Sequence, residues 1–209
     1  MKKKSLFHGL AWLTAFAIWT VLVCLIDVQP IGPMESTVGF ATLNEAVHKL
    51  IGEKLFLYYL TDWLSLIPVA VMAGAALVGA VQLIRRRSLL SVDRGILALG
   101  AIYGALAVFY VLFEAVPINF RPVLIEGALE ASYPSSTTLL VLCVMPTAAM
   151  YVCSQIREKR LVYWLSWGFA VAMVLMRLMS GVHWFTDIVG GVLLSAALIE
   201  LYRAICNLN

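Results

Sequence analysis

Long apolar segments alternate with short polar segments along most of the chain. A helix needs roughly 20 mostly apolar residues to cross the hydrocarbon core of a membrane. Six segments reach this length, at about 6–26, 57–84, 95–115, 136–156, 161–180 and 187–206. The pattern predicts an all-α integral membrane protein in which six transmembrane helices form a single bundle.

The longest hydrophilic passage, residues 27–54, follows the first span. Apolar residues in its second half recur at helical spacing, which predicts a short amphipathic helix or lid on the outer membrane surface. These residues are Leu43, Val47, Leu50 and Ile51. His48 lies in the same segment, and we expect it to be an exposed surface histidine.

No internal repeat or low-complexity linker divides the chain, so residues 1–209 are expected to form a single membrane-embedded domain. The start, Met-Lys-Lys-Lys before an apolar run, also has features of a signal peptide. That run is long for a signal peptide, however, and it lacks a small-x-small cleavage site. Val23 stands where a lipoprotein cleavage box has a small residue before its cysteine. An uncleaved first span is therefore predicted.

Composition and charge agree with a membrane protein and set its orientation. Hydrophobic residues make up 62% of the chain, charged residues only 13%, and the mean hydropathy is +0.93, which excludes an ordinary soluble domain. Most basic residues fall on one side of the six-span alternation, and such a side is normally cytoplasmic. They are Lys2, Lys3, Lys4, Arg85, Arg86, Arg87, Arg94, Arg157, Lys159, Arg160 and Arg203.

This asymmetry predicts that both termini are cytoplasmic, in a multi-pass protein of the cell membrane (a bacterial inner membrane or a plasma membrane). The other side is acidic, so the net charge of +3 hides a basic inside and an acidic outside. The basic residues then report topology and contact with anionic lipids, which argues against nucleic acid as a partner.

Candidate chemistry concentrates between the last two spans. Ionisable groups at the edge of a membrane span are costly and are therefore candidate functional groups. Arg177, His183 and Asp187 stand in this stretch. His183 and Asp187 are four residues apart, so on a helix the carboxylate would lie beside the imidazole and orient it as a nucleophile or base.

A second group of polar residues opens the fourth span. Tyr133-Pro134-Ser135-Ser136-Thr137-Thr138 contains several capping residues. The run predicts a well-capped helix, and free amides at a helix start also form an anion site. Arg121 and Arg177 share the outer side with this helix start, and arginine pairs match the oxygens of phosphate. The expected ligand is a lipid phosphate at the membrane surface.

Metal chemistry is a weaker alternative. His183 and Asp187 have ligand-like spacing, but no complete ligand set is apparent around them. We therefore predict no metal and no cofactor. The four cysteines, Cys24, Cys143, Cys153 and Cys206, fall in or at the ends of spans, where ordinary packing is expected.

These residues resemble the membrane branch of the type 2 phosphatidic acid phosphatase family. That family has the motifs Lys-x6-Arg-Pro, Pro-Ser-Gly-His and Ser-Arg-x5-His-x3-Asp. Arg177, His183 and Asp187 keep the third spacing, with Met176 in place of serine. The first two motifs are altered. Arg121-Pro122 and Pro134-Ser135 are kept, whereas Glu114, Ser136 and Thr137 replace Lys, Gly and His.

The resemblance implies hydrolysis of a lipid phosphate or polyprenyl diphosphate at the outer face. His183 would form a phosphohistidine, Asp187 would orient it, and the phosphate would be held by Arg121, Arg177 and residues 135–137. Thr137 cannot serve as a general acid near neutral pH. Glu114 is a possible acid, or it pairs with Arg121 and faces away. The alternative is a non-catalytic relative that binds or moves a lipid phosphate or serves as a membrane partner.

Overall fold

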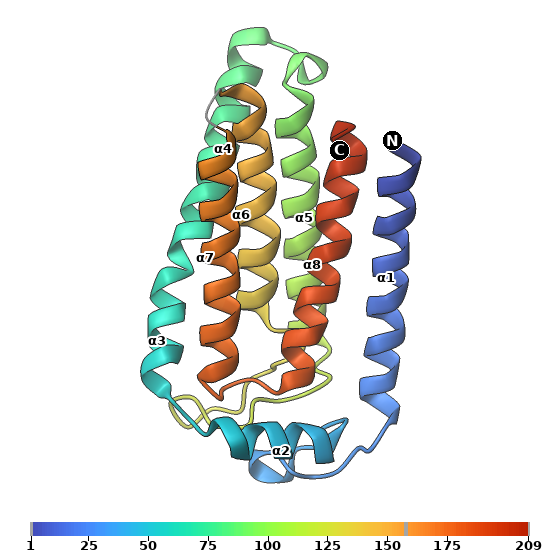
Figure 1. Cartoon of the computed structure of the whole chain (residues 1–209), viewed down its shortest axis with the longest axis vertical. Helices are drawn as coiled ribbons and strands as arrows, with labels where there is room; N and C mark the ends of the chain where they lie inside the picture. Colours follow the sequence, from blue (N-terminus) through green and yellow to red (C-terminus); the bar gives the residue numbers. More distant parts are fainter. Residues whose placement is uncertain (1, 157–158, 209) are drawn as a thin grey trace.

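The computed structural model describes residues 2–156 and 159–208 of the chain. Within these ranges the polypeptide forms α-helices, short 3-10 turns and loops, and no β-strand. Its α-helices are α1 (Lys2–Leu25), α2 (Ala41–Ile51), α3 (Leu55–Leu64), α4 (Leu66–Arg86), α5 (Arg94–Ala115), α6 (Ser136–Gln155), α7 (Lys159–Met179) and α8 (Phe185–Cys206). Figure 1 shows the long helices running side by side as a bundle.

The described residues contain six helical segments long and apolar enough to cross a membrane. They correspond to the six predicted spans, so the all-α, six-span architecture is confirmed. The second span differs in detail because α3 and α4 are separate helices that meet at Ser65. Pro68 explains the break: a proline has no N–H to donate to the carbonyl four residues earlier, and its ring clashes with that carbonyl.

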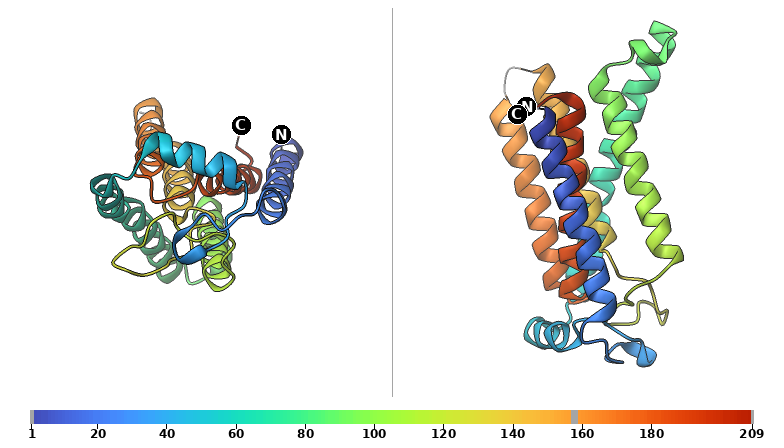
Figure 2. Two further views of the ribbon diagram at one scale, coloured as in Figure 1. Left: turned by 90° about the horizontal axis from the view of Figure 1, so that it is seen from below. Right: turned by 90° about the vertical axis from the view of Figure 1, so that its right-hand side faces the viewer.

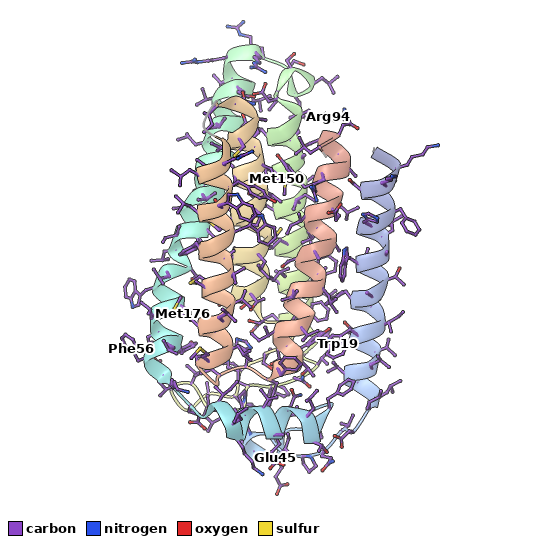
Figure 3. All side chains as sticks on the ribbon, viewed as in Figure 1. Trp19, Glu45, Phe56, Arg94, Met150 and Met176 are labelled. Atoms are coloured by element: carbon purple, nitrogen blue, oxygen red, sulfur yellow. The ribbon has the colours of Figure 1, made fainter. Side chains whose placement is uncertain are left out.

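The predicted amphipathic helix is α2, which lies across one end of the bundle (Figures 1 and 2). Its buried residues are Ala41 and Asn44, and most of its other side chains are exposed or half-buried. The start of α1 and the end of α8 lie together at the opposite end of the bundle. Figure 3 shows the same polarity in side chains, with Glu45 on α2 and Arg94 near the other end. Arg157, which contributed to the predicted orientation, lies outside the described residues.

Helices α6 and α8 form the centre of the bundle. In each, 56% of the apolar window is buried, whereas the other spans are at most one-third buried. Helix α1 packs along α8 (Figure 2), and Phe16 of α1 joins Tyr133 and Leu194 in the main apolar core. The start of α8 contacts α2, and α6 packs against α8.

The loop between α5 and α6 is irregular but tied down by backbone hydrogen bonds. The Arg121 N–H donates to the Glu130 carbonyl at 3.0 Å, and the Ser132 N–H donates to the Asn119 carbonyl at 2.9 Å. These bonds fold the loop back on itself beneath α6. Arg121 is thereby held at the same end of the bundle as the start of α8.

Candidate functional site

The starts of α6 and α8 touch each other directly. The backbone N–H of Ser135 donates to the carbonyl of Asp187 at 3.1 Å. Two glycines of α8 permit this approach. A Cβ on Gly190 would lie 2.6 Å from the Tyr133 ring, and one on Gly191 would lie 3.0 Å from the Thr138 side chain. The glycine pair after Asp187 thus brings two predicted site segments together.

Arg121 and Arg177 meet over one aromatic ring. Their guanidinium carbons lie 5.4 and 4.7 Å from the centre of the Tyr58 ring. Both arginines are buried, with 8% and 1% of their surface exposed. A cation over an aromatic face is stabilised by the ring quadrupole. Tyr58, on α3, was not predicted as a site residue, because only the fold brings it between two arginines far apart in sequence.

Each arginine also has a polar partner that holds it in place. Arg177 Nη1 donates to Thr61 Oγ1 at 3.0 Å and to the Tyr58 carbonyl at 3.4 Å. Arg121 Nε lies 2.9 Å from Glu130 Oε2. The partner of Arg121 is therefore Glu130, which corrects the alternative in which Glu114 pairs with Arg121.

His183 lies in the turn between α7 and α8 and is only 4% exposed. Its Nδ1 is 3.6 Å from Asp187 Oδ2, close but longer than a hydrogen bond. Burial, followed by the positive charges of Arg121 and Arg177, lowers the pKa of His183 well below its usual value, although a nearby Ser132 carbonyl opposes this shift. The imidazole is therefore neutral near pH 7.

Asp187 is held by two hydrogen bonds. Its Oδ2 accepts the backbone N–H of Trp184 at 3.0 Å, which caps the first turn of α8. Its Oδ1 accepts a bond from Asn119 Nδ2 at 3.0 Å. With both oxygens engaged, the carboxylate is fixed beside the His183 ring.

An asparagine on α2 extends this network. Asn44 Nδ2 donates to Thr186 Oγ1 at 2.9 Å, and the Thr186 N–H donates to Asn44 Oδ1 at 3.2 Å. Asn44 and Asn119 are fully buried, at 0% and 1% exposed. The sequence analysis did not identify either residue. Asn44 could have been noticed as a polar residue on the buried face of an amphipathic helix, and Asn119 as a polar residue two positions before Arg121.

The prediction that His48 is an exposed surface histidine was wrong. It is half-buried, its Nε2 lies 3.1 Å from the Gly181 carbonyl, and its ring packs on Trp184 with centroids 5.5 Å apart. The reason is that α2 docks onto the turn that carries His183. The Lys54 N–H also donates to the Ser180 carbonyl at 2.8 Å, so two contacts fasten this turn from outside the bundle.

Many buried polar atoms around this centre have no hydrogen-bond partner among the described residues. They are Arg121 Nη1, Arg177 Nε, Ser132 Oγ, Ser135 Oγ, Thr138 Oγ1, and both ring nitrogens of His183. Buried polar groups normally have a hydrogen-bond partner, and a buried donor or acceptor without one costs about 1–3 kcal/mol. Such a concentration of donors fits a ligand with several anionic oxygens.

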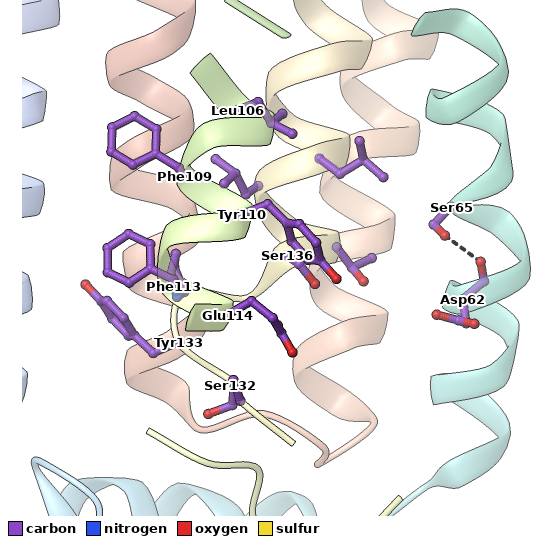
Figure 4. Close-up of a pocket in the computed structure, with 15 residues that line it drawn as sticks. Asp62, Ser65, Leu106, Phe109, Tyr110, Phe113, Glu114, Ser132, Tyr133 and Ser136 are labelled. Atoms are coloured by element: carbon purple, nitrogen blue, oxygen red, sulfur yellow. Dashed lines mark hydrogen bonds between the residues drawn. The ribbon is translucent and has the colours of Figure 1, made fainter. Parts of the chain in front are cut away.

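The other predicted residues lie beside this centre. Ser136, Thr137 and Glu114 line a cavity of about 260 Å³ between α3, α5 and α6 (Figure 4). Glu114 is exposed at the end of α5 and extends into this space. The fold therefore divides the predicted residues into a buried basic centre and an adjoining cavity that carries the altered motif positions.

Residues 107–208 match the family model of the PAP2 superfamily. The match covers just under half of the chain, whose C-terminal part is therefore similar to the PAP2 superfamily. The PAP2 segment includes Arg121, Ser135, Arg177, His183 and Asp187, whereas Tyr58 and Asn44 come from helices outside it. No curated protein sequence gives a significant match to the chain.

The fold is similar to a solved structure described as the first transmembrane PAP2 type phosphatidylglycerolphosphate phosphatase from Bacillus subtilis. The two chains are 18% identical, the TM-score is 0.68, and the match covers 96% of each chain. At this identity the likeness establishes the fold. Together with the six apolar helices, it supports a multi-pass membrane protein.

Proposed function

We propose that this chain hydrolyses a lipid phosphate at the outer face of the membrane through a phosphohistidine intermediate. The observation that carries the proposal is the set of unpartnered donors on Arg121, Arg177 and Ser135 around a buried, neutral His183. A phosphoryl group supplies acceptor oxygens for the donors and an electrophilic centre for the imidazole.

The geometry supports the following proposed roles. One nitrogen of His183 attacks phosphorus, an N–P bond forms, and the P–O bond to the leaving group breaks. Asp187, 3.6 Å from Nδ1, stabilises the positive charge that develops on the ring. Arg121, Arg177 and the Ser135 hydroxyl bind the remaining phosphoryl oxygens. Water then cleaves the N–P bond, releases phosphate and returns the imidazole to its neutral state.

The substrate is proposed to be a lipid because the basic centre lies at the end of the transmembrane helices. The charge asymmetry of the chain supports an orientation with this end outside the cytoplasm. The PAP2 match is consistent with a lipid phosphate, and the similar solved structure is described as a phosphatidylglycerolphosphate phosphatase. A polyprenyl diphosphate is also a proposed substrate, and it would ease the loss of the motif histidine because its leaving group needs less protonation.

Departure of the leaving group needs a proton, and Thr137 cannot supply it near neutral pH. Glu114, which lines the same cavity as Thr137, stays the predicted donor. Its test is Glu114→Gln, which should slow phosphate release roughly 100-fold or more if the carboxyl donates a proton. An unchanged rate and pH profile would remove Glu114 from this step.

The direct test of the proposed function is phosphate release from a panel of lipid phosphates by purified protein. Wild type is expected to release phosphate, and His183→Ala is expected to lose this activity by roughly 100-fold or more. His8→Ala is the matched control, because His8 lies on α1 far along the chain from the site and should leave the rate unchanged.

The second candidate is a non-catalytic protein that binds or moves a lipid phosphate. The replacement of the motif histidine by Thr137 favours it, since binding needs the arginines but no proton donor. Under this alternative, wild type would release no more phosphate than His183→Ala, while Arg121→Gln would still weaken binding of the lipid.

A further inference from the structure

Tyr58 lies where the segments that supply both arginines meet. It belongs to one small buried apolar cluster with residues of the α5–α6 loop and of the turn between α7 and α8. These residues are Val123, Ile125 and Val182. The loop carries Arg121, and the turn directly follows the end of α7, which carries Arg177. Tyr58 itself comes from α3, outside the segment that matches the PAP2 superfamily.

The ring of Tyr58, rather than its hydroxyl, makes the contacts with the arginines. The guanidinium carbons of Arg121 and Arg177 lie over the ring, at 5.4 and 4.7 Å from its centre. The Tyr58 backbone carbonyl also accepts a hydrogen bond from Arg177, as does the hydroxyl of Thr61 on the same helix. The Tyr58 hydroxyl makes no hydrogen bond with any described residue. Its loss should therefore leave these contacts in place.

Two buried cations beside one ring repel each other, and this repulsion has to be opposed when no anion is bound. The hydrogen bonds of Arg177 to described residues go to neutral oxygens, which do not cancel its charge. Both guanidinium groups are within the range of about 6 Å at which the negative face of an aromatic ring attracts a cation. Because Tyr58 is only 8% exposed, water screens this attraction little.

We propose that Tyr58 is a positioning residue, whose electron-rich ring holds Arg121 and Arg177 together in the arrangement that binds the phosphoryl group. The inference rests on the proposed function. Tyr58 acts through the two arginines and takes no part in making or breaking bonds, so Glu114 keeps its predicted role as the proton donor. Helix α3 thereby contributes to phosphate binding, although it lies outside the PAP2 segment.

A fluorination series at position 58 separates the electrostatics of the ring from its size. Fluorine withdraws electron density from the ring face and weakens its attraction for a cation, whereas fluorinated phenylalanines keep nearly the shape of phenylalanine. With phosphatidic acid in detergent, Tyr58→Phe should keep most of the wild-type kcat/KM. Mono-, di- and trifluorinated phenylalanine at this position should lower kcat/KM stepwise, by about tenfold across the series. Tyr58→Leu should lose at least as much.

Phe56 provides the matched control, because it is an aromatic residue on the same helix that is 76% exposed (Figure 3). The same fluorinated residues at position 56 should leave kcat/KM unchanged. Equal kcat/KM values for all the aromatic variants at position 58 would show that Tyr58 only fills space, and would overturn the inference while the proposed function stands. A Tyr58→Phe variant as impaired as Tyr58→Leu would assign the role to the hydroxyl and would also overturn it.

Binding separates the two proposals if wild type hydrolyses no lipid phosphate. That result would contradict the proposed function, whereas the dissociation constant of phosphatidic acid still reports on how the arginines are held. Stepwise weaker binding along the fluorination series would support the role of the Tyr58 ring. Equal binding by all the aromatic variants would reject it.

Discussion

At the scale of single residues, the site places two buried arginines beside one buried histidine. Arg121 and Arg177 share the Tyr58 ring, and both lower the pKa of His183. Like charges held together in a buried position are costly unless an anion joins them. The phosphoryl group of the proposed substrate would supply such an anion, and burial together with these charges lowers the pKa of His183.

The state of His183 gives a prediction for pH dependence. In the proposed mechanism only the neutral ring can attack phosphorus, and the pKa of His183 in the folded protein lies below its usual value of 6.5. The acid limb of kcat/KM should therefore appear below pH 6.5, with activity lost as the pH falls through the lowered pKa. Arg121→Gln removes one of the charges responsible, so it should move this limb to higher pH as well as reduce the rate.

Arg94→Gln is the control for this profile, because Arg94 lies near the other end of the bundle (Figure 3). It should leave the acid limb where it is. An acid limb that Arg121→Gln does not move would show that His183 is not the titrating group, or that Arg121 does not act on it.

Some residues of the site could be predicted from the sequence, and others could not. The spacing from Arg177 to Asp187 is local, so the neighbourhood of His183 and Asp187 could be predicted from helical geometry. Tyr58 and Asn119 could not, because their roles depend on contacts between segments more than 60 residues apart. Ser136 and Thr137 were grouped with Ser135, yet they line the adjoining cavity because successive helical residues face different directions.

At the scale of elements, α2 acts as a support for the turn that carries His183. Asn44 binds Thr186, His48 contacts Gly181, and the residues after α2 meet the same turn. The amphipathic pattern predicted this helix, but not its docking, since a surface helix and a docked helix have the same periodicity. The break between α3 and α4 was missed because Pro68 stands inside an otherwise unbroken apolar run.

Gly181 is the residue on which this docking depends. Its φ is +72°, and a Cβ there would lie 2.2 Å from the Gly52 carbonyl oxygen. Gly181→Ala is expected to destabilise the fold by about 1–3 kcal/mol and to reduce hydrolysis by displacing His183. Thermal unfolding in detergent, together with the hydrolysis rate, measures both effects.

Gly168→Ala provides the comparison, because a Cβ on this α7 glycine meets nothing within 4 Å. In a helix interior that change should be neutral or slightly stabilising. If the two variants unfolded at the same temperature and were equally active, the close contact between the α2–α3 connection and the His183 turn would not matter for stability or function.

At the scale of the whole molecule, the bundle separates charge along its axis. Helix α2 lies at one end and the chain termini lie at the other (Figure 1). The turn that carries His183 contacts α2, so the basic centre lies at the α2 end. The number of spans and this polarity follow from composition, which is why the sequence predicted them. Which end faces out of the cell is a separate prediction, made from the side on which Lys and Arg residues gather.

Site-specific labelling checks that orientation. Leu50 on α2 is 86% exposed, and Leu90 between α4 and α5 at the other end is 94% exposed. In a background without the four native cysteines, Leu50→Cys should react with a membrane-impermeant maleimide added to intact cells. Leu90→Cys should react only after the cells are permeabilised. The reverse pattern would put the proposed active site in the cytoplasm.

The most direct test of the account is to trap the covalent intermediate. Wild type mixed with a lipid carrying a radiolabelled phosphate and quenched in base should yield labelled protein whose label is acid-labile and maps to the peptide containing His183. His183→Ala should yield none. Phosphate release by wild type without such a label, or a label on another residue, would contradict the assignment of His183 as the nucleophile.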